Sequence, residues 1–395
     1  MNDSLIRYLE ANRDRYLEEL RALVGQDSGS FDKAGVDAVQ SWLQARLAGL
    51  GFAVERVPNQ PHGDDLVARL PGTGRERVRG RVRGRVLLLG HADTVFPAGT
   101  AAARPLTIAG DVIHGPGACD MKGGLLCGIY AVEALLASGW PGLELLSFVV
   151  VSDEEIGARH SIPLLEREGR AHDAVLTLEA ARENGDIVTA RKAVRWYTVE
   201  AAGRAAHAGV EPEKGASATL AIARLVVAAA VLNDLRPGVT LNTGELRGGS
   251  APNVVADHAL ARFELRAWTA ADLDAAEAAL RALTERDWVP GVTMTMSFEP
   301  GSGMPAMERT PGVVALEELA RASAASLGFA LQGAATGGAS DVAYAMRGGT
   351  PGLDGLGPIG GLDHGPDEYI LLSSIVSRTA LLARLLAALG ERELP

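Results

Sequence analysis

Cysteine is scarce in this chain, where only Cys119 and Cys127 occur among 395 residues. Small secreted domains that depend on disulfides are rich in cysteine. A disulfide framework is therefore not expected. Because a chain of this length exceeds the usual size of one hydrophobic core, we expect two domains.

Long hydrophobic runs are also missing. No run of about 18 apolar residues is evident, and the apolar stretch at 222–231 is short and carries an arginine. The N-terminal stretch at 1–26 has apolar residues at helical spacing among many charges, so it predicts one amphipathic helix. It lacks the apolar centre of a secretory signal. We expect a cytoplasmic protein without a membrane span.

Positive charge is in deficit, with 38 lysines and arginines against 49 aspartates and glutamates, a net charge of −11. This argues against nucleic acid as the main partner. One segment departs from the trend: RERVRGRVRGRV at 75–86 places arginine at alternate positions. It could form a nucleic-acid patch, or a solvated hairpin or edge strand. The overall charge favours the second interpretation.

The first part of the chain alternates short apolar segments with helical patterns. Five segments are typical of strands: 52–57, 66–70, 86–90, 145–151 and 174–178. Between the third and the fourth, GGLLCGIYAVEALLASG has apolar residues at helical spacing. This alternation predicts an α/β fold, with helices on both faces of a mixed, mostly parallel sheet.

The character of the sequence changes near residue 191. The patterns that follow alternate in the order βαββαβ: 196–203, 216–234, 239–249, 253–268, 269–283 and 292–300. That order is typical of a ferredoxin-like α+β unit. Thr269 and Asp272 form a capping pair at the start of its second helix. We expect one domain at 1–190 and 304–395, interrupted by a second at 191–303.

Five side chains that can bind metal follow apolar runs or lie in glycine-rich turns. They are His91 after VLLLG, Asp120 in GPGACDMKGG, Glu155 after LLSFVVVSDE, Glu179 after AVLTL and His364 in GGLDHGPDEY. In open α/β sheets, ligands gather at the carboxyl ends of the strands. Five ligands are too many for one tetrahedral zinc ion and suit two ions that share a carboxylate.

Two acids stand beside these candidates. Asp93 is two residues from His91 on an extended segment, so both side chains point the same way and the carboxylate can orient the imidazole. Glu154 and Glu155 are adjacent and point differently. One of them can therefore bind metal while the other acts as a general base.

Taken singly, each motif also has an ordinary structural interpretation. Asp120 and Glu179 could cap helices, and His364 could lie on a surface loop. Together, the order His-x-Asp, Asp, Glu-Glu, Glu, His strongly resembles the M20 family of zinc peptidases and amidohydrolases, in its glutamate carboxypeptidase (carboxypeptidase G2-like) branch. The resemblance extends to three further segments: GRAAHAG (203–209), GGSAPNVVADHALARFELR (248–266) and TGGASDVAYA (336–345).

The resemblance implies a catalytic domain that binds two zinc ions, with Asp120 between them. It implies that His91 and Glu179 complete the ligands of one ion, and that Glu155 and His364 complete those of the other. Cobalt or manganese would fit the same nitrogen and oxygen donors.

The resemblance also implies the roles of the neighbouring residues. Glu154 would be the general base, and Asp93 would orient His91. A cis peptide bond is expected between Asp120 and Met121. The reaction implied is hydrolysis of an amide or peptide bond in a small peptide or N-acyl amino acid, next to a free C-terminal carboxylate.

The inserted domain would then be a lid that also forms a homodimer. By resemblance, His207 reaches across from the other subunit and donates a hydrogen bond to the tetrahedral oxyanion. Arg266 offers a planar fork suited to a carboxylate, and Asn253 with the backbone of Gly337 and Gly338 would help to hold the substrate.

Several alternatives stay open. The same site could serve an N-acyl-amino-acid deacylase, a dipeptidase or an aminopeptidase, although glutamate at the position of Glu179 goes with carboxypeptidase and deacylase members. The fold could also belong to a non-catalytic binding protein, but such a protein should have lost a ligand or the base. A scaffold dimer would not explain why the histidines and acids follow the family order.

Overall fold

The computed structural model describes residues 2–72, 84–140, 142–299 and 303–391. Most of the arginine-rich segment at 75–86 lies outside these residues. The chain forms two compact units. Unit 1 consists of Met1–Thr189, Arg309–Ala335 and Ser340–Pro395, and unit 2 of Ala190–Glu308 and Thr336–Ala339. The second domain was expected to end at 303, whereas unit 2 continues to Glu308.

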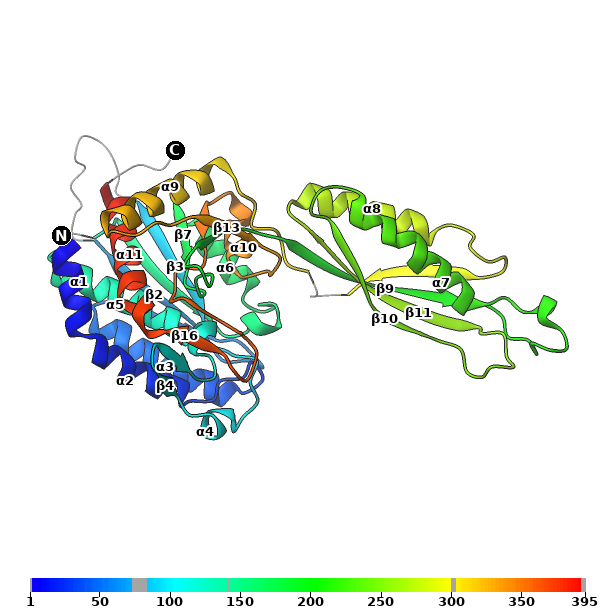
Figure 1. The fold of residues 1–395 in the computed structure, drawn as a ribbon, viewed down its shortest axis with the longest axis horizontal. Coiled ribbons are helices and arrows are strands. Elements are labelled where there is room, and N and C mark those ends of the chain that lie inside the picture. The colour runs from blue at the N-terminus through cyan, green and yellow to red at the C-terminus, as the bar shows by residue number, and fades with distance from the viewer. Residues whose placement is uncertain (1, 73–83, 141, 300–302, 392–395) are drawn as a thin grey trace. The chain divides into compact units, whose positions relative to one another are not determined.

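The main sheet of unit 1 has six strands. In spatial order they are β1 (Ala53–Val57), β2 (Asp65–Pro71), β6 (Leu145–Val151), β3 (Arg85–His91), β7 (Ala174–Thr177) and β14 (Gly352–Leu353). Strands β6, β3, β7 and β14 run parallel, while β2 is antiparallel to β6 and β1 is antiparallel to β2. The predicted mixed, mostly parallel sheet is confirmed (Figure 1).

Helices cover both faces of this sheet, as predicted. On one face, Leu88 and Phe148 belong to the same core as the buried side of α5 (Gly123–Ala137). On the other face, Ser147 Oγ lies 2.8 Å from Nε2 of His172, which follows α6 (Ile162–Arg170). The parallel strands are buried from both sides, which explains why their sequences read as continuous apolar runs.

The N-terminal stretch forms two helices, α1 (Asn2–Ala11) and α2 (Arg13–Val24), where one was expected. Asn12 separates them with φ −106° and ψ 7°. Its side-chain Nδ2 donates to the carbonyl of Tyr8 at 2.8 Å, a local bond that competes with a continuous helix. The apolar positions that predicted the helix are nevertheless buried in the core.

The last helix, α11 (Leu372–Glu391), packs against α5 and α1. By length and composition it could cross a membrane, which we did not expect from the sequence. However, 67% of its apolar window is buried inside the protein, as in the core helix of many soluble proteins.

The remaining elements of unit 1 surround this core. They are α3 (Lys33–Gly49), α4 (Thr100–Ala103), β4 (Thr107–Ala109), β5 (Val112–His114), α9 (Pro311–Ser326), α10 (Val342–Ala345), β15 (Gly360–Gly361) and β16 (Tyr369–Leu371). Strands β15, β16, β5 and β4 form a small sheet. A further two-stranded sheet pairs β8 (Ile187–Arg191) with β13 (Gly333–Thr336).

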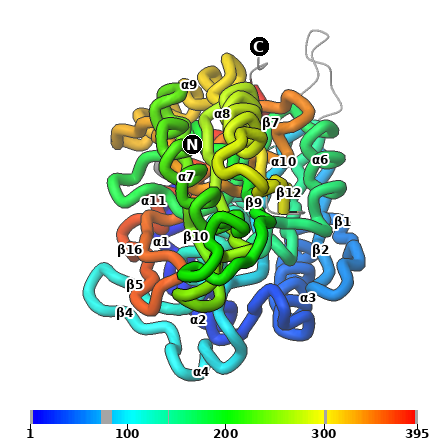
Figure 2. The backbone as a smooth tube through the Cα atoms, turned by 90° about the vertical axis from the view of Figure 1, so that its right-hand side faces the viewer, coloured from blue at the N-terminus to red at the C-terminus, as the bar shows by residue number. Residues whose placement is uncertain are grey.

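Unit 2 has the predicted βαββαβ order. Its elements are β9 (Ala193–Ala202), α7 (Ala218–Ala229), β10 (Thr240–Gly248), β11 (His258–Ala267), α8 (Ala270–Thr284) and β12 (Thr293–Phe298). The strands form one antiparallel sheet in the order β10-β11-β9-β12, and α7 and α8 share a core with it. Figure 2 shows the course of the backbone through α7 and α8. Thr269 Oγ1 accepts a hydrogen bond from the backbone N–H of Asp272 at 3.1 Å, which confirms the predicted cap.

Two elements of unit 2 are shorter than their patterns suggested. The helix expected at 216–234 ends at Ala229 and continues as a 3-10 turn to Asp234. The strand expected from 253 begins only at His258. The segment before it pairs instead with the His207 loop, where the N–H of Ala208 donates to the carbonyl of Asn253 at 2.9 Å.

Candidate metal centre

Three predicted ligands follow neighbouring parallel strands of unit 1. His91 is the last residue of β3, and Glu155 lies in a 3-10 turn (Glu154–Ile156) shortly after β6. Glu179 follows the end of β7 by two residues. Because β6, β3 and β7 are adjacent and parallel, their carboxyl ends meet at one edge of the sheet.

Asp120 comes from the loop that leads into α5. The peptide bond between Asp120 and Met121 is cis, as the family resemblance implied. The loop is held by Glu368, a buried residue whose carboxylate accepts the backbone N–H groups of Gly117, Cys119 and Asp120 at 3.0, 2.9 and 3.0 Å. Glu368 thus fixes the backbone that carries Asp120.

The start of α5 packs directly on the segment that carries Glu179. A Cβ added to Gly124 would lie only 1.8 Å from the carbonyl oxygen of Leu178. Only glycine allows the helix and this segment to approach so closely. The helix that follows the loop of Asp120 is therefore in direct contact with the residue before Glu179.

Asp120 links two clusters of possible metal ligands. In the first, His91 Nε2 lies 2.9 Å from Asp120 Oδ1 and 3.5 Å from Glu179 Oε1. In the second, His364 Nε2 lies 3.1 Å from Asp120 Oδ2 and 3.1 Å from Glu155 Oε2. Within each cluster, the ligand atoms lie within 4.8 Å of one another. The structure thus brings all five predicted ligands to one place.

The charges of this centre suit two cations. Burial and the neighbouring charge of Asp120 raise the pKa of Glu179 to about 7. Burial also raises the pKa of Glu155, although a hydrogen bond from His364 opposes the shift. Among the described residues, the buried Oε1 of Glu155 has no hydrogen-bond partner. Two imidazoles and three carboxylates, one of them shared, fit a pair of divalent ions bound by nitrogen and oxygen.

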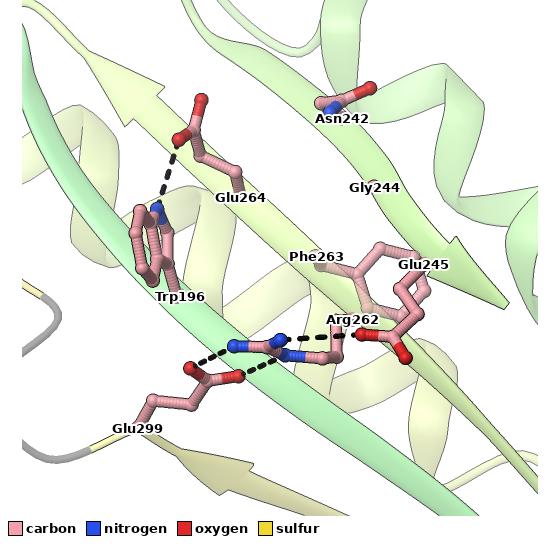
Figure 3. Close-up of a pocket in the computed structure, with 8 residues that line it drawn as sticks. All are labelled: Trp196, Asn242, Gly244, Glu245, Arg262, Phe263, Glu264 and Glu299. Carbon is pink, nitrogen blue, oxygen red and sulfur yellow. Dashed lines mark hydrogen bonds and ion pairs between the residues drawn. The ribbon is translucent and has the colours of Figure 1, made fainter.

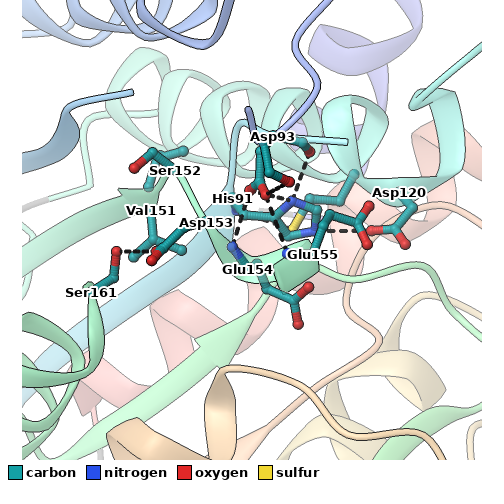
Figure 4. A network of polar contacts seen from close by, with 12 residues as sticks. His91, Asp93, Asp120, Val151, Ser152, Asp153, Glu154, Glu155 and Ser161 are labelled. Carbon is teal, nitrogen blue, oxygen red and sulfur yellow. Dashed lines mark hydrogen bonds and ion pairs between the residues drawn. The ribbon is translucent and has the colours of Figure 1, made fainter. Parts of the chain in front are cut away.

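The carboxylate of Asp93 has a different contact from the expected one. His91 Nδ1 lies 3.0 Å from the main-chain carbonyl of Asp93 and 3.5 Å from its side-chain Oδ1. The carbonyl therefore orients the imidazole. The carboxylate accepts the hydroxyl of Ser30 at 2.6 Å and the backbone N–H groups of Glu154 and Glu155, each at 3.2 Å (Figure 4). It holds the turn that carries the two glutamates.

Glu154 stands apart from the ligand clusters. In Figure 4 no dashed line reaches its carboxylate, and no hydrogen bond or ion pair joins that carboxylate to the described residues. Burial raises its pKa well above the usual value, and the charge of Asp341 adds to the shift. A partly buried carboxylate that binds protons readily has the properties of a general base.

Sequence reasoning missed Asp341 and Glu368. Asp341 is 3% exposed, and neither of its carboxylate oxygens has a hydrogen-bond partner in the described part of the chain. Its only sequence signal is an acid within the segment TGGASDVAYA. Glu368 lies four residues after His364, but nothing in that spacing predicts that it binds the Asp120 loop.

A second pair of buried acids lies behind the turn of the two glutamates. Ser161 Oγ lies 2.5 Å from Asp153 Oδ1 (Figure 4). It also lies 3.0 Å from Asp65 Oδ1. Burial raises the pKa of Asp65 to about 6; hydrogen bonds from Ser152 and Ser161 oppose this shift, and the charge of Asp153 adds to it. These acids anchor the end of β6 from within the core.

In unit 2, the guanidinium of Arg266 is already paired. Its Nε and Nη2 donate to the carboxylate of Glu264 at 2.8 and 3.1 Å, and its Nη1 donates to the carbonyl of Gly337 at 2.5 Å. Two of the predicted substrate-binding residues, Arg266 and Gly337, therefore contact each other. The backbone of Gly338 accepts from Arg191 Nη1 at 3.1 Å.

His207 lies exposed in a loop of unit 2. Its Nδ1 accepts the backbone N–H of Gly209 at 3.1 Å. In the neutral imidazole the proton is then on Nε2, which is left as a hydrogen-bond donor. Asn253 lies close to it in the fold, because its carbonyl accepts the N–H of Ala208.

Comparisons with known proteins also indicate a peptidase. A model described as peptidase family M20/M25/M40 matches residues 87–388. Carboxypeptidase G2 of Pseudomonas sp. (strain RS-16) is 28% identical over 379 residues, covering 95% of this chain and 89% of the relative. A succinyl-diaminopimelate desuccinylase of Rhodospirillum centenum is 28% identical over 371 residues, covering 89% of this chain and 90% of the relative.

A solved structure shares the fold. Aminopeptidase PepT from Bacillus cereus superimposes with a TM-score of 0.83 at 23% identity, covering 96% of this chain and 99% of that chain. The family match spans most of the chain and contains all five candidate ligands. The chain therefore belongs to peptidase family M20/M25/M40 and is a metallohydrolase of peptide or amide bonds.

Proposed function

We propose that this metallohydrolase is a di-zinc enzyme that cleaves an amide or peptide bond next to a free C-terminal carboxylate. The observation that carries the proposal is the position of Asp120, whose two oxygens contact His91 and His364 in two separate clusters. Glu154, which has a raised pKa, precedes the ligand candidate Glu155 in the same 3-10 turn. Such an arrangement suits hydrolysis assisted by two metal ions.

The proposed metal sites share one carboxylate. His91, Asp120 and Glu179 would hold one ion, and Asp120, Glu155 and His364 would hold the other. When bound, two such ions polarise a carbonyl group and lower the pKa of a water molecule. The hydrogen bond from His91 Nδ1 to the carbonyl of Asp93 leaves Nε2 available as a ligand atom. Zinc is proposed, and cobalt or manganese would bind the same donors.

Glu154 is the proposed general base. Its carboxylate accepts the proton of the attacking water and returns it to the leaving nitrogen. Asp93 supports this role from behind, because its side chain accepts the backbone N–H groups of Glu154 and Glu155. The backbone of the base is therefore held in position, while the Glu154 carboxylate has no hydrogen-bond partner within the part of the chain that the structure describes.

Recognition of the substrate carboxylate is assigned to unit 2. We propose that Arg266 binds it, helped by Asn253 and the backbone of Gly337 and Gly338. The existing pair between Arg266 and Glu264 implies that the substrate competes with Glu264 for the guanidinium. His207, with its Nε2 proton free to donate, is proposed to stabilise the oxyanion.

We propose that the enzyme is a homodimer that forms through unit 2. Leu220, Val227 and Val231 are 44%, 75% and 64% exposed, and their spacing places them on one side of α7 and its 3-10 extension. The opposite side buries Ile222 and Leu225 in the core of unit 2. An exposed apolar stripe of this kind is typical of a self-association surface. His207 would then serve the neighbouring subunit.

An N-acyl-amino-acid deacylase is the second candidate. It is supported by the desuccinylase of Rhodospirillum centenum, which is as similar to this chain in percentage identity as carboxypeptidase G2 is. Both candidates cleave next to an amino acid with a free carboxylate. A non-catalytic binding protein is less well supported, because the five ligand candidates and Glu154 are all present.

The test uses the zinc-loaded protein and a panel of dipeptides and N-acyl amino acids that end in Glu, Asp, Phe or Leu. Each is paired with its C-terminal amide. We expect the free acids to be hydrolysed about 100-fold faster than the amides, because a buried charged contact is lost in the amides. Equal rates would contradict the proposal. Cleavage that requires a free N-terminus would indicate an aminopeptidase or dipeptidase.

A matched variant separates chemistry from metal binding. Glu154→Gln should retain two metal ions per chain and lose kcat by about a thousandfold or more. If the variant turns over substrate at near the normal rate, Glu154 is not the base. If the wild-type protein binds two ions and hydrolyses none of the panel, the chain is a binding protein.

A further inference from the structure

A pocket of about 490 Å³ opens in unit 1 directly beside the candidate metal centre. It is lined by the loops at 29–32 and 94–98 and by Glu155 and Ile156. Glu155 therefore belongs both to this pocket and to the cluster with His364. A group bound in the pocket would be next to the reacting bond.

Hydrogen bonds connect a loop of the pocket with the turn that carries Glu155. The hydroxyl of Ser30 donates to Asp93, whose carboxylate also accepts the N–H of Glu155. The two loops contact each other so closely that a Cβ on Gly29 would lie 2.5 Å from the carbonyl oxygen of Phe96. The walls of the pocket and the ligand Glu155 are therefore parts of one connected structure.

A second set of contacts fixes the outer loop. Asp27 accepts the backbone N–H groups of Gly99 and Ala101 at 2.7 and 2.8 Å. Arg104 lies over the ring of Phe96, 4.5 Å from its centroid, and its Nη1 donates to the carbonyl of Gly365 at 3.2 Å. The ring of Phe96 is thus tied to the loop that carries His364.

The lining of the pocket is mainly apolar. Phe31, Val95, Phe96, Pro97 and Ile156 supply most of its hydrophobic side chains. Phe31 is 81% exposed and Val95 is 39% exposed. Exposed apolar side chains at a cavity usually indicate a binding surface. They provide a surface that an apolar ligand would cover.

The charges at the pocket have one sign. Asp32 and Glu155 line it, and no lysine or arginine is among the described residues that do. An anionic group placed there would find no lysine or arginine of the lining to pair with, and most of the surface around it would be apolar. The lining therefore favours an uncharged group.

We propose that this pocket binds an uncharged, apolar group attached to the scissile carbonyl, such as an aliphatic acyl chain or the apolar side chain of the preceding residue. This inference rests on the proposed amide hydrolysis. The acyl side is assigned because Glu155 lines the pocket, whereas Glu154, which serves the leaving nitrogen, does not. Discrimination against an acidic acyl group would set this enzyme apart from a desuccinylase.

The experiment uses zinc-loaded enzyme and four N-acyl derivatives of one amino acid, with acetyl, butanoyl, hexanoyl and succinyl groups. We expect kcat/KM to rise about threefold for each added methylene and to be lowest for succinyl. In Phe31→Ala the ratio of hexanoyl to acetyl should fall several-fold. Ile108→Ala, which removes another exposed apolar side chain of unit 1, should keep the wild-type ratio.

A variant with an added positive charge should become more active toward one substrate, and a loss of folding could not produce such an increase. Val95→Lys adds a cation to the pocket wall and should raise the ratio of succinyl to hexanoyl at least tenfold. Equal kcat/KM values across the wild-type series, or ratios that do not change in Phe31→Ala and Val95→Lys, would overturn the proposal. Hydrolysis itself would stand in that case.

Binding provides a measurement that does not depend on turnover. Calorimetry with the zinc-loaded Glu154→Gln protein should give a lower Kd for the hexanoyl than for the acetyl compound, and Phe31→Ala in that background should remove the difference. This result would support the pocket even if the wild-type enzyme failed to hydrolyse the series. The absence of any difference in Kd, together with ordinary hydrolysis, would reject the pocket alone.

Discussion

The Oδ2 atom of Asp93 accepts a hydrogen bond from the hydroxyl of Ser30 at 2.6 Å. Asp93 is fully buried, and its carboxylate also accepts the backbone N–H groups of Glu154 and Glu155. One carboxylate thus connects the loop at 29–32 with the turn that carries the proposed base and a proposed metal ligand. Its main effect is on the position of that turn.

The first prediction concerns Asp93. Asp93→Ala should lower kcat/KM by about 100-fold, because two N–H groups lose their acceptor and the turn of Glu154 and Glu155 shifts. Ser30→Ala removes only one donor and should have a clearly smaller effect. Steady-state kinetics measures both. If the variants lose activity equally, the turn does not depend on Asp93 in the way described.

The second prediction concerns metal stoichiometry. Asp120→Ala should bind less than one ion per chain, because Asp120 belongs to both clusters. Glu179→Ala and His364→Ala should each retain about one. Elemental analysis after removal of free metal gives the numbers. Two ions bound to Asp120→Ala would show that the clusters are independent sites.

The third prediction concerns Glu368. Glu368→Gln replaces one carboxylate oxygen with an NH2 group, which cannot accept a hydrogen bond, so at least one backbone N–H group of the Asp120 loop loses its acceptor. Metal affinity should fall about 10- to 100-fold, as for other residues that support ligands. A chelator competition assay measures the change. Asp367→Asn, which alters an exposed neighbour, is the control and should bind metal normally.

The fourth prediction concerns pH and compares two adjacent acids. Burial raises the pKa of Asp65 to about 6, so the folded protein holds a proton that the unfolded chain releases near pH 4. Stability contributed at low pH is therefore lost as pH rises from about 4 to 6. Asp65→Asn should remove this loss, which amounts to roughly 2–3 kcal/mol.

Asp64 is the control for that experiment. Burial would raise its pKa, but the ion pair with Lys33 outweighs this and lowers it. Its contribution to stability is therefore present above its usual pKa and lost as pH falls. Asp64→Asn should lose stability at pH 7.5 and little at pH 3.5. Urea unfolding of the metal-free protein tests both variants; parallel pH profiles would contradict the assignment.

The fifth prediction concerns the apolar stripe on α7. Val227→Asp or Val231→Asp places a charge on the proposed dimer surface and should shift the protein to a monomer in sedimentation experiments. Ile108→Asp introduces the same charge at an exposed site of unit 1 and should leave the oligomeric state unchanged. A wild-type protein that sediments as a monomer would reject the dimer.

The parallel strands were predictable because burial on both faces gives continuous apolar runs, as in LLSFVVV before Asp153. The metal ligands at the ends of these strands could be predicted because they directly follow the apolar runs. The break at Asn12 was not predictable, because it lies in the backbone geometry of one residue, while the apolar pattern continues across it. The same holds for the length of the strand before Arg266, whose first residues pair with the loop of His207 instead of extending β11.

The supporting residues of the site could not be found from the sequence. The spacing of Asp93 and His91 predicted correctly that they are neighbours, but it could not separate the carbonyl from the carboxylate as the contact of the imidazole. Glu368 and Asp120 are far apart in the chain and carry no shared pattern. The sequence predicted that the guanidinium of Arg266 could bind a carboxylate, but it did not indicate that the carboxylate of Glu264 already binds there.

Because Gly124 lies against the carbonyl of Leu178, the metal centre does not tolerate a larger residue at Gly124, although Gly124 is not one of the proposed ligands. One methyl group there would have to separate the helix behind Asp120 from the segment before Glu179. Two ligands of the same cluster would then move apart although neither had been replaced. A damaging substitution in this protein can therefore leave every metal-binding side chain intact and change only the distance between the two pieces of backbone that present them.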